Sequence, residues 1–289
     1  MYKDKKIILF AFASKDLSRS ANRLLIQAKN TNYYDEIKIL SPNNFDDEMK
    51  EKFNSLNEDD KKRGYGYWFW KPFFLKRIMD VANTNDIVHY VDIGCHIQNK
   101  NTRFQDYMKI LINPDIWILP FQYNIEKSFP NDILFNQRYE YQFTKADLLA
   151  HFGFLHEKKI THTPQYWAGS FFLKNCEKTK IFLTEWISLF DKKFDLINDS
   201  RSSLKNYDGF IENRHDQSVF SLLCKKYSIK SLSAYECEWG EKFNKRTWEH
   251  NLNNPILAKR DLKYNFVKRF LNRQRKNWNR IKKNFFDKS

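Results

Sequence analysis

The stretch from Asp86 to His96 constrains the fold of this chain more than any other. A short apolar run, rich in β-branched residues, is followed directly by Asp92 and then by Gly94. This pattern is typical of a buried strand. In open α/β sheets, ligands bind beyond the carboxyl ends of the strands. We therefore expect Asp92 to present a carboxylate at a rigid strand end, beside a glycine that lets a ligand come close. The alternative is that Asp92 only caps the turn that follows.

Strands and helices are predicted to alternate in the first part of the chain. Residues 6–13 and 36–40 predict strands, and residues 18–29 between them carry apolar side chains at the spacing of one helix face. This order favours an α/β fold with a parallel sheet. The glycine motifs of a Rossmann dinucleotide-binding turn and of a P-loop are both absent from the sequence, so neither phosphate-binding loop is expected.

The positive charge of the chain is concentrated at its C-terminal end. The formal net charge is +15, and residues 259–289 contain twelve Lys or Arg against two Asp, which leaves +5 for the other 258 residues. Apolar residues recur there at helical spacing, so we expect a catalytic domain of residues 1–257 and a basic amphipathic helical tail of residues 258–289. Anionic lipid attracts such a tail by about 1 kcal/mol per basic residue near the surface. The alternative is a solvated helix that packs on the domain.

Composition narrows the classes of protein further. No apolar segment reaches 18 residues, and the four cysteines form no CxxC pair, so neither a membrane span nor a zinc site is expected. Nucleic acid is not expected as a partner, because no RNA- or DNA-binding motif is present. The short apolar run near the N-terminus favours a strand over a signal peptide. Together with the basic tail, these features predict a cytoplasmic protein that is peripheral on the inner face of the cytoplasmic membrane.

The stretch from Arg63 to Pro72 combines two glycines and five aromatic residues, and it ends in Lys71 and Pro72. Proline suits the first turn of a helix, and the glycines predict a shaped loop before it. One interpretation is that the aromatic rings stack on a base or sugar while Arg63 and Lys71 hold phosphate. The other is an aromatic plug under the sheet.

Residues 165–175 predict a tight turn of small residues, at 168–170, that leads into an apolar strand at 171–173. A turn of this kind either lets the backbone approach a ligand or only closes the edge of a sheet.

Four functional side chains, at positions 214–217, stand directly before an apolar helix. Asp216 suits helix capping, because a carboxylate near a helix N-terminus is favoured. Flanked by Arg214 and His215, it also suits acid/base chemistry or the binding of a sugar. The later His250 is either a metal ligand or, as a lone histidine, a structural residue.

Taken in this order, these stretches resemble glycosyltransferases of the GT-A type, particularly bacterial enzymes that build capsular polysaccharide or lipooligosaccharide. Residues 90–94 look like the Asp-x-Asp strand end of that family, and residues 167–175 are similar to its segment facing the donor sugar. Residues 215–218 are similar to an Asp-Gln segment beside the acceptor in several retaining families. The resemblance spans residues 6–251, and it implies a GT-A-like, Rossmann-related α/β fold whose mixed, mainly parallel sheet is flanked by helices.

The resemblance implies a retaining transfer of a sugar from a nucleotide-diphosphate-sugar donor to a growing surface glycan, and it assigns residues to each role. The implied catalytic residues are Asp216 and Gln217. The implied donor-binding residues are Ala13, Arg63, Tyr67, Trp70, Lys71, Asp92, Gly94, Ala168, Gly169 and Ser170. The implied acceptor-binding residues are Gln165, Trp167 and His215, and the implied metal ligands are Asp92 and His250.

One departure from the family pattern concerns the metal. Gly94 stands where the family has its second aspartate, so Mn²⁺ or Mg²⁺ would be held by Asp92, water, the donor phosphates and His250. Arg63 or Lys71 could supply part of the positive charge instead. Two other functions stay open from the sequence. One is a non-catalytic protein that binds a polyanion or a membrane, and the other is transfer of a non-sugar group onto a glycan.

Overall fold

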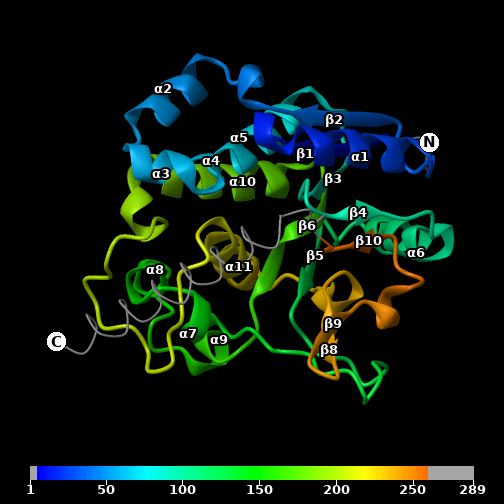
Figure 1. The fold of residues 1–289 in the computed structure, drawn as a ribbon. Coiled ribbons are helices and arrows are strands. Elements are labelled where there is room, and N and C mark those ends of the chain that lie inside the picture. Colours follow the sequence, from blue (N-terminus) through cyan, green and yellow to red (C-terminus); the bar gives the residue numbers. More distant parts are fainter. Residues whose placement is uncertain (1–4, 260–289) are drawn as a thin grey trace. The chain divides into compact units, whose positions relative to one another are not determined.

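The computed structural model describes residues 5–259 of the 289-residue chain. A six-stranded sheet lies at its centre, in the order β2-β1-β3-β6-β5-β7 (Figure 1). Its strands are β1 (Ile7–Phe12), β2 (Glu36–Leu40), β3 (Ile87–Val91), β5 (Ile118–Gln122), β6 (Tyr166–Lys174) and β7 (Leu232–Ser233). Two small antiparallel sheets pair β4 (His96–Ile97) with β10 (Ile256–Leu257) and β8 (Gly240–Lys242) with β9 (Lys245–Thr247).

Three of the five strand pairings in the central sheet are parallel, and β6 runs antiparallel to both of its neighbours. The predicted α/β fold with a mixed, mainly parallel sheet is therefore confirmed. Its helices are α1 (Ser18–Lys29), α2 (Asp47–Ser55), α3 (Glu58–Lys62), α4 (Gly64–Tyr67), α5 (Trp70–Val81), α6 (Asn101–Ile112), α7 (Glu140–Phe143), α8 (Ala146–His151), α9 (Lys158–Thr161), α10 (Glu177–Lys192) and α11 (Asp216–Lys226).

Each face of the sheet has its own hydrophobic core. In β1, the side chain of Phe10 belongs to the core that includes α5, α10 and α11. The side chain of its neighbour Leu9 points to the opposite face and belongs to the core that includes α1 and α6. Alternate strand residues point to opposite faces, and helices cover both faces here. This is why all six residues of β1 are buried and the strand lacks the apolar–polar alternation of a half-exposed sheet.

The reversed direction of β6 brings its first half beside the carboxyl end of β3. Val91 pairs with Ser170, and the Asp92 amide donates to the Gly169 carbonyl at 2.7 Å. The predicted turn at 168–170 is therefore wrong, because these residues lie inside β6. Against β5 the register jumps from Pro120–Phe171 to Phe121–Trp167, so residues 168–170 form a bulge. Bulges of this kind redirect the chain beside functional sites.

Residues 64–68 form a left-handed turn. Their φ angles are all positive, at +58°, +57°, +84°, +54° and +63°. Only two of the five are glycine, and a left-handed conformation costs other residues about 1–2 kcal/mol each. The turn is held from α5, where the Trp70 indole donates to the Gly64 carbonyl at 3.0 Å and stacks on Phe12. The predicted shaped loop is confirmed, and such strain is concentrated at functional sites in many proteins.

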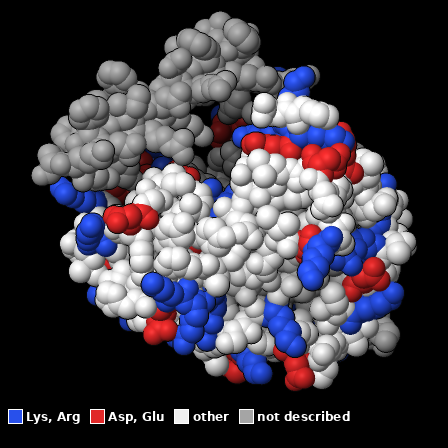
Figure 2. Space-filling model, turned by 90° about the horizontal axis from the view of Figure 1, so that it is seen from below, with Lys and Arg blue, Asp and Glu red and all other residues white. Residues whose placement is uncertain are grey.

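Charged side chains of both signs lie next to one another on the face shown in Figure 2, with a broad uncharged area between them. Within residues 5–259, no helix is both long enough and apolar enough to cross a membrane. Of the predicted basic tail, residues 260–289 lie outside the described part of the chain.

Candidate active site

A buried ammonium group is the centre of the candidate site. Lys71, in the first turn of α5, is 2% exposed. Its Nζ donates to Oδ2 of Asp216 and to the Ala168 carbonyl, the latter at 3.0 Å, and it lies 4.0 Å from Oδ1 of Asp92. Buried charges in proteins are usually paired and hydrogen-bonded, and this ammonium has both kinds of partner. Four segments that are far apart in the sequence thus meet around one cation.

Tyr90 lies in β3 and Asp92 directly follows this strand, so their side chains, two residues apart, point to the same side. The Tyr90 hydroxyl donates to Oδ1 of Asp92 at 2.5 Å, and its ring lies 4.6 Å from Nζ of Lys71. The side chain of Asp92 keeps 37% of its surface exposed. Asp92 is therefore a carboxylate that is held from within the fold and still faces solvent.

Asp216 is the first residue of α11 and is buried. Burial raises the pKa of its carboxyl to about 6 by disfavouring the charged form. The Lys71 ammonium opposes this shift, and the Asp92 carboxylate adds to it. A pKa near the working pH is what a general acid or base requires, and the carboxyl of Asp216 meets that requirement.

A second polar cluster connects the left-handed turn to α11 through Asp199. Its carboxylate accepts hydrogen bonds from Arg63 at 2.8 Å and Tyr67 at 3.1 Å, and it lies 3.1 Å from Nε2 of His215. His215 has φ +56° and packs against the Tyr67 ring. Burial lowers the pKa of His215, which keeps its imidazole neutral near pH 7.

Burial raises the pKa of the Asp199 carboxyl, but its contacts with His215, Arg63 and Tyr67 lower it more. The pKa is therefore held well below the usual range. Asp199 was not predicted as a functional residue, because nothing in the polar sequence around it marks it.

Gln217 is positioned by a buried polar network. Its amide donates to Oε1 of Gln165 at 2.9 Å, and the Gln165 amide donates in turn to Oε2 of Glu140 at 3.1 Å and to Oγ1 of Thr144 at 3.0 Å. Lys225 neutralises Glu140 at 3.2 Å. Gln165, predicted to bind the acceptor, is fully buried beside Gln217. It therefore does not lie on a surface where an acceptor binds.

Several of the predicted donor and acceptor residues lie apart from Lys71. Ser170 points to the opposite face of the sheet, where its hydroxyl contacts Nε2 of His89 at 2.9 Å. Trp167 is buried on that face too, and a Cβ on Gly169 would overlap its indole. Ala13 is buried at the end of β1 and Trp70 is buried on Phe12, whereas Gly94 lies in the turn after Asp92.

The described residues do not form a metal site by themselves. Within residues 5–259, no group of three or more His, Cys, Asp or Glu side chains lies together as metal ligands would. His250 has Nε2 3.0 Å from the Glu238 carbonyl and packs against Phe129 and Phe135. Mg²⁺ takes six oxygen ligands, and Asp92 is the one solvent-facing carboxylate at Lys71. The residues therefore do not fit a protein-held cation, and an ammonium already lies between the two carboxylates.

No protein-family model and no curated protein matches the sequence. Among solved structures, a glycosyltransferase involved in glycosylation of the major capsid of PBCV-1 matches with a TM-score of 0.47 and 10% identity, over 91% of this chain and 96% of that one. The galactosyltransferase LgtC, solved with donor and acceptor sugar analogues, matches with a TM-score of 0.42 and 12% identity, over 92% and 94%.

Mouse xyloside xylosyltransferase 1 also matches, with a TM-score of 0.42 and 11% identity, over 80% and 86%. These three structures are all of glycosyltransferases. At these identities and TM-scores the likeness identifies no activity, and the function has to be inferred from the site.

Proposed function

We propose that this protein is a glycosyltransferase that moves a sugar from a nucleotide-diphosphate-sugar donor to a glycan, at the site around Lys71. One observation carries the proposal. Asp92 and Asp216 belong to the two stretches that resemble the donor and acceptor motifs of such enzymes, and in the fold both carboxylates meet the same buried ammonium. If Asp92 only ended a strand and Asp216 only capped a helix, nothing would require these residues, 124 positions apart in the sequence, to contact the same cation.

The reaction makes definite chemical demands. The bond between the anomeric carbon and the donor phosphate breaks, and its electron pair leaves with the nucleoside diphosphate. A bond forms between that carbon and an acceptor oxygen, which gives up its proton. In between, the sugar ring gains positive charge, so a nearby carboxylate stabilises the transition state more than the ground state.

Asp216 supplies that carboxylate in the proposed mechanism. With a pKa of about 6, it is mostly ionised at pH 7. We propose a retaining reaction, in which Asp216 stabilises the charge on the ring and an oxygen of the leaving phosphate takes the acceptor proton. Gln217 holds a sugar hydroxyl, because its amide is oriented from behind by Gln165.

Lys71 acts as a positioning residue. Its bonds to Asp216 and to the Ala168 carbonyl fix the carboxylate relative to the β6 bulge. Asp92, exposed and steadied by Tyr90, accepts hydrogen bonds from the hydroxyls of the donor sugar. Arg63, exposed directly before the left-handed turn, is a candidate cation for the diphosphate.

The experiment is release of nucleoside diphosphate from UDP-, GDP- and CDP-sugars in the presence of mixed glycan acceptors. Wild-type protein is expected to release the diphosphate and label a glycan. Asp216→Asn and Asp92→Asn are expected to lose at least about 100-fold in rate, as expected when a positioned charged group is removed. Asp80→Asn, an exposed aspartate paired with Lys76 on the same α5 helix, serves as the control. Full activity in both site variants would refute the assignment, and NMR of the product decides between retention and inversion.

We also propose that the acceptor is a growing surface glycan, of the capsule or lipooligosaccharide kind, and that residues 258–289 hold the enzyme on an anionic membrane. The net charge of +10 over residues 259–289 supports this. Co-sedimentation with vesicles containing phosphatidylglycerol tests it. The full chain is expected to bind, and a chain that ends at residue 257 is expected not to bind. Equal binding of the two would contradict the proposal.

A further inference from the structure

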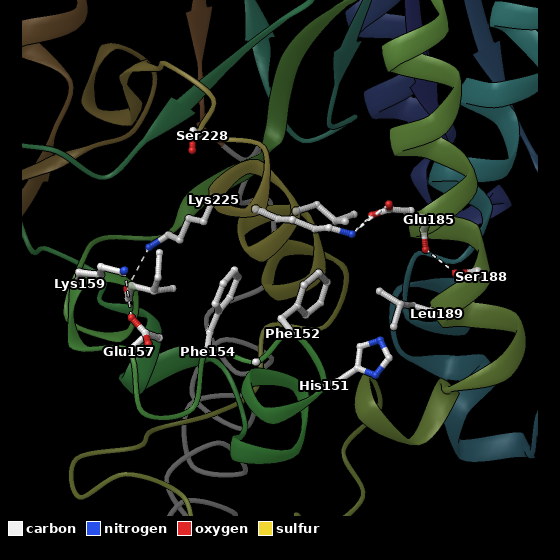
Figure 3. A pocket seen from close by; sticks show the side chains of 14 residues that line it. His151, Phe152, Phe154, Glu157, Lys159, Glu185, Ser188, Leu189, Lys225 and Ser228 are labelled. Atoms are coloured by element: carbon white, nitrogen blue, oxygen red, sulfur yellow. Dashed lines mark hydrogen bonds and ion pairs between the residues drawn. The ribbon is translucent and has the colours of Figure 1, made fainter.

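A hollow lies apart from the Lys71 site, between α8, α9, α10 and α11 (Figure 3). Its volume is about 690 Å³, within the range of pockets that bind small molecules. It contains none of the residues that contact Lys71. The helix α11 links the two places, because Asp216 begins this helix and Lys225 and Lys226 end it. At 1.5 Å per residue, this separates them by roughly 15 Å.

The pocket has an aromatic wall. The side chains of Phe152 and Phe154 point into the hollow from one side (Figure 3), and their ring planes lie within 15° of one another with centroids 6.0 Å apart. Gly153 stands between them with φ +73°, and a Cβ there would meet nothing within 4 Å. Leu189 from α10 and Leu223 from α11 add apolar surface. Gly153 places no side chain between the two rings, so a ligand in the pocket would lie against them.

Ion pairs make up the rim. Lys159 pairs with Glu157 at 3.2 Å on one side of the hollow, and Lys226 pairs with Glu185 at 2.9 Å on the other. Figure 3 shows Glu157 and Lys159 on one side of the hollow and Glu185 on the opposite side. Lys225 also lines the hollow, and its ammonium group is neutralised by the buried Glu140 at 3.2 Å. The charges that face the pocket are thus balanced, with donors and carboxylate acceptors on both sides.

This combination limits the chemistry of the occupant. A wholly apolar ligand would strip water from two ion pairs without replacing its hydrogen bonds, which is costly. An anion would meet Glu157 and Glu185, and a cation would meet Lys159 and Lys226. A neutral ligand with many hydroxyl groups satisfies both walls, because a hydroxyl donates to carboxylates and accepts from ammonium groups. The apolar faces of such a ligand can lie on the phenylalanine rings.

We propose that this pocket binds a neutral oligosaccharide, as a second site for the part of the glycan acceptor that does not react. The proposal rests on the proposed function, since it makes the pocket part of acceptor recognition. Binding at a remote position can be used to hold a substrate at the reacting centre. None of the pocket residues belongs to the proposed catalytic machinery, so binding to the pocket can be measured without any transfer.

The test is protein-observed NMR of methyl groups, with maltotriose, chitotriose and lacto-N-tetraose as probes at about 10 mM, which detects millimolar affinity. The methyl signals of Ile160, Leu189 and Leu223 are expected to shift with at least one probe, while those of Ile8 on the central sheet stay in place. If no probe moves the pocket methyls, the proposal is wrong.

Two variants locate the binding. Phe154→Ala removes part of the aromatic wall, and the double variant Glu157→Ala/Lys159→Ala removes one exposed ion pair with little risk to folding. Each is expected to weaken binding by about tenfold or more. The control is Lys205→Ala/Asp208→Ala, an exposed pair outside the pocket that is 3.7 Å apart. Equal affinity in the pocket variants and the control would overturn the proposal.

The outcome is independent of the catalytic test. Glycan binding in a protein that transfers no sugar would refute the proposed function and leave the pocket as a glycan site. Sugar transfer without any shift of the pocket methyls would support the proposed function and refute the pocket as a glycan site.

Discussion

Removing the positive charge of Lys71 tests the central cluster most severely. In Lys71→Met the buried Asp216 loses its partner, and breaking a buried ion pair from one side costs about 3–5 kcal/mol. The carboxyl can limit this cost by taking up a proton. At pH 7, protonating Asp216 in the wild-type fold, where its pKa is about 6, costs about 1.4 kcal/mol, from about one unit at 1.36 kcal/mol. Because proton uptake limits the loss, we expect Lys71→Met to lower the free energy of unfolding by about 1.5–3 kcal/mol at pH 7.

The pKa of Asp216 determines how this loss of stability changes with pH. A carboxyl whose folded pKa lies above its unfolded value stabilises the fold at low pH and loses that contribution as pH rises through the folded pKa. Without Lys71, the pKa of Asp216 rises further above its value of about 6. The difference in stability between wild type and Lys71→Met is therefore expected to be small near pH 4 and to grow up to about pH 8.

Urea unfolding of the wild type, the two single variants and the double variant measures the coupling free energy between Lys71 and Asp216. Removing both members of a buried pair leaves no unpaired charge, so Lys71→Met/Asp216→Asn is expected to be less destabilised than the sum of the single variants, by at least about 1.5 kcal/mol. Lys76→Met, whose partner Asp80 is exposed on the same helix, is the control and is expected to cost less than about 1 kcal/mol. Additive effects within about 0.5 kcal/mol would refute the claim that Lys71 and Asp216 form one unit.

Three further predictions concern the surroundings of the cluster. Gly169→Ala is expected to cost about 1–3 kcal/mol in urea unfolding, because the new methyl group overlaps the Trp167 indole, and an unchanged midpoint would show that the bulge is free to adjust. Asp199 has a lowered pKa, so its contribution to stability is present above about pH 4 and is lost as pH falls through its folded pKa. Asp199→Asn is therefore expected to flatten the fall in stability below that pH, and an unaltered acid profile would contradict this. Mn²⁺ without nucleotide is expected to bind more weakly than about 1 mM by electron paramagnetic resonance, because the cluster offers one exposed carboxylate, and tighter binding that Asp92→Asn removes would contradict the site as described.

The elements that could be predicted from the sequence are those whose side-chain pattern is local. The helix predicted at 18–29 is α1, and the strands predicted at 36–40 and 87–91 are β2 and β3. In each case the period of apolar residues and the flanking polar residues were enough. The glycines at 64 and 66 likewise indicated the shaped loop.

The direction of β6 could not be predicted in this way. Residues 171–173 are equally apolar in a parallel and an antiparallel strand, because both faces of this sheet are covered by helices. The antiparallel direction of β6 nevertheless determines the geometry of the site, since it brings Gly169 beside Asp92. Residues 168–170 predict a turn because small residues are typical of turns, but they form a bulge in a continuous strand.

The partners of the predicted site residues were also beyond sequence reasoning. Lys71 and Asp216 were both identified as candidates, but their contact joins helices 145 positions apart and depends on the packing of α5 and α11 on the same face. Asp199 was missed because it lies in a polar loop without periodicity. Tyr90 could have been found, because it stands two residues before Asp92 on one strand and so shares its face.

Binding of a nucleotide sugar tests the central claim most directly. A ligand at ten times its dissociation constant stabilises the fold by about 1.4 kcal/mol, which raises the unfolding temperature of a domain of this size by about 3–5 °C. We expect one of the UDP-, GDP- or CDP-sugar classes to produce this shift in wild-type protein and in Asp80→Asn, and to produce none in Asp92→Asn. A shift of equal size in Asp92→Asn, or no shift with any nucleotide sugar in the presence or absence of Mn²⁺, would contradict the assignment of the Lys71 site as the donor site.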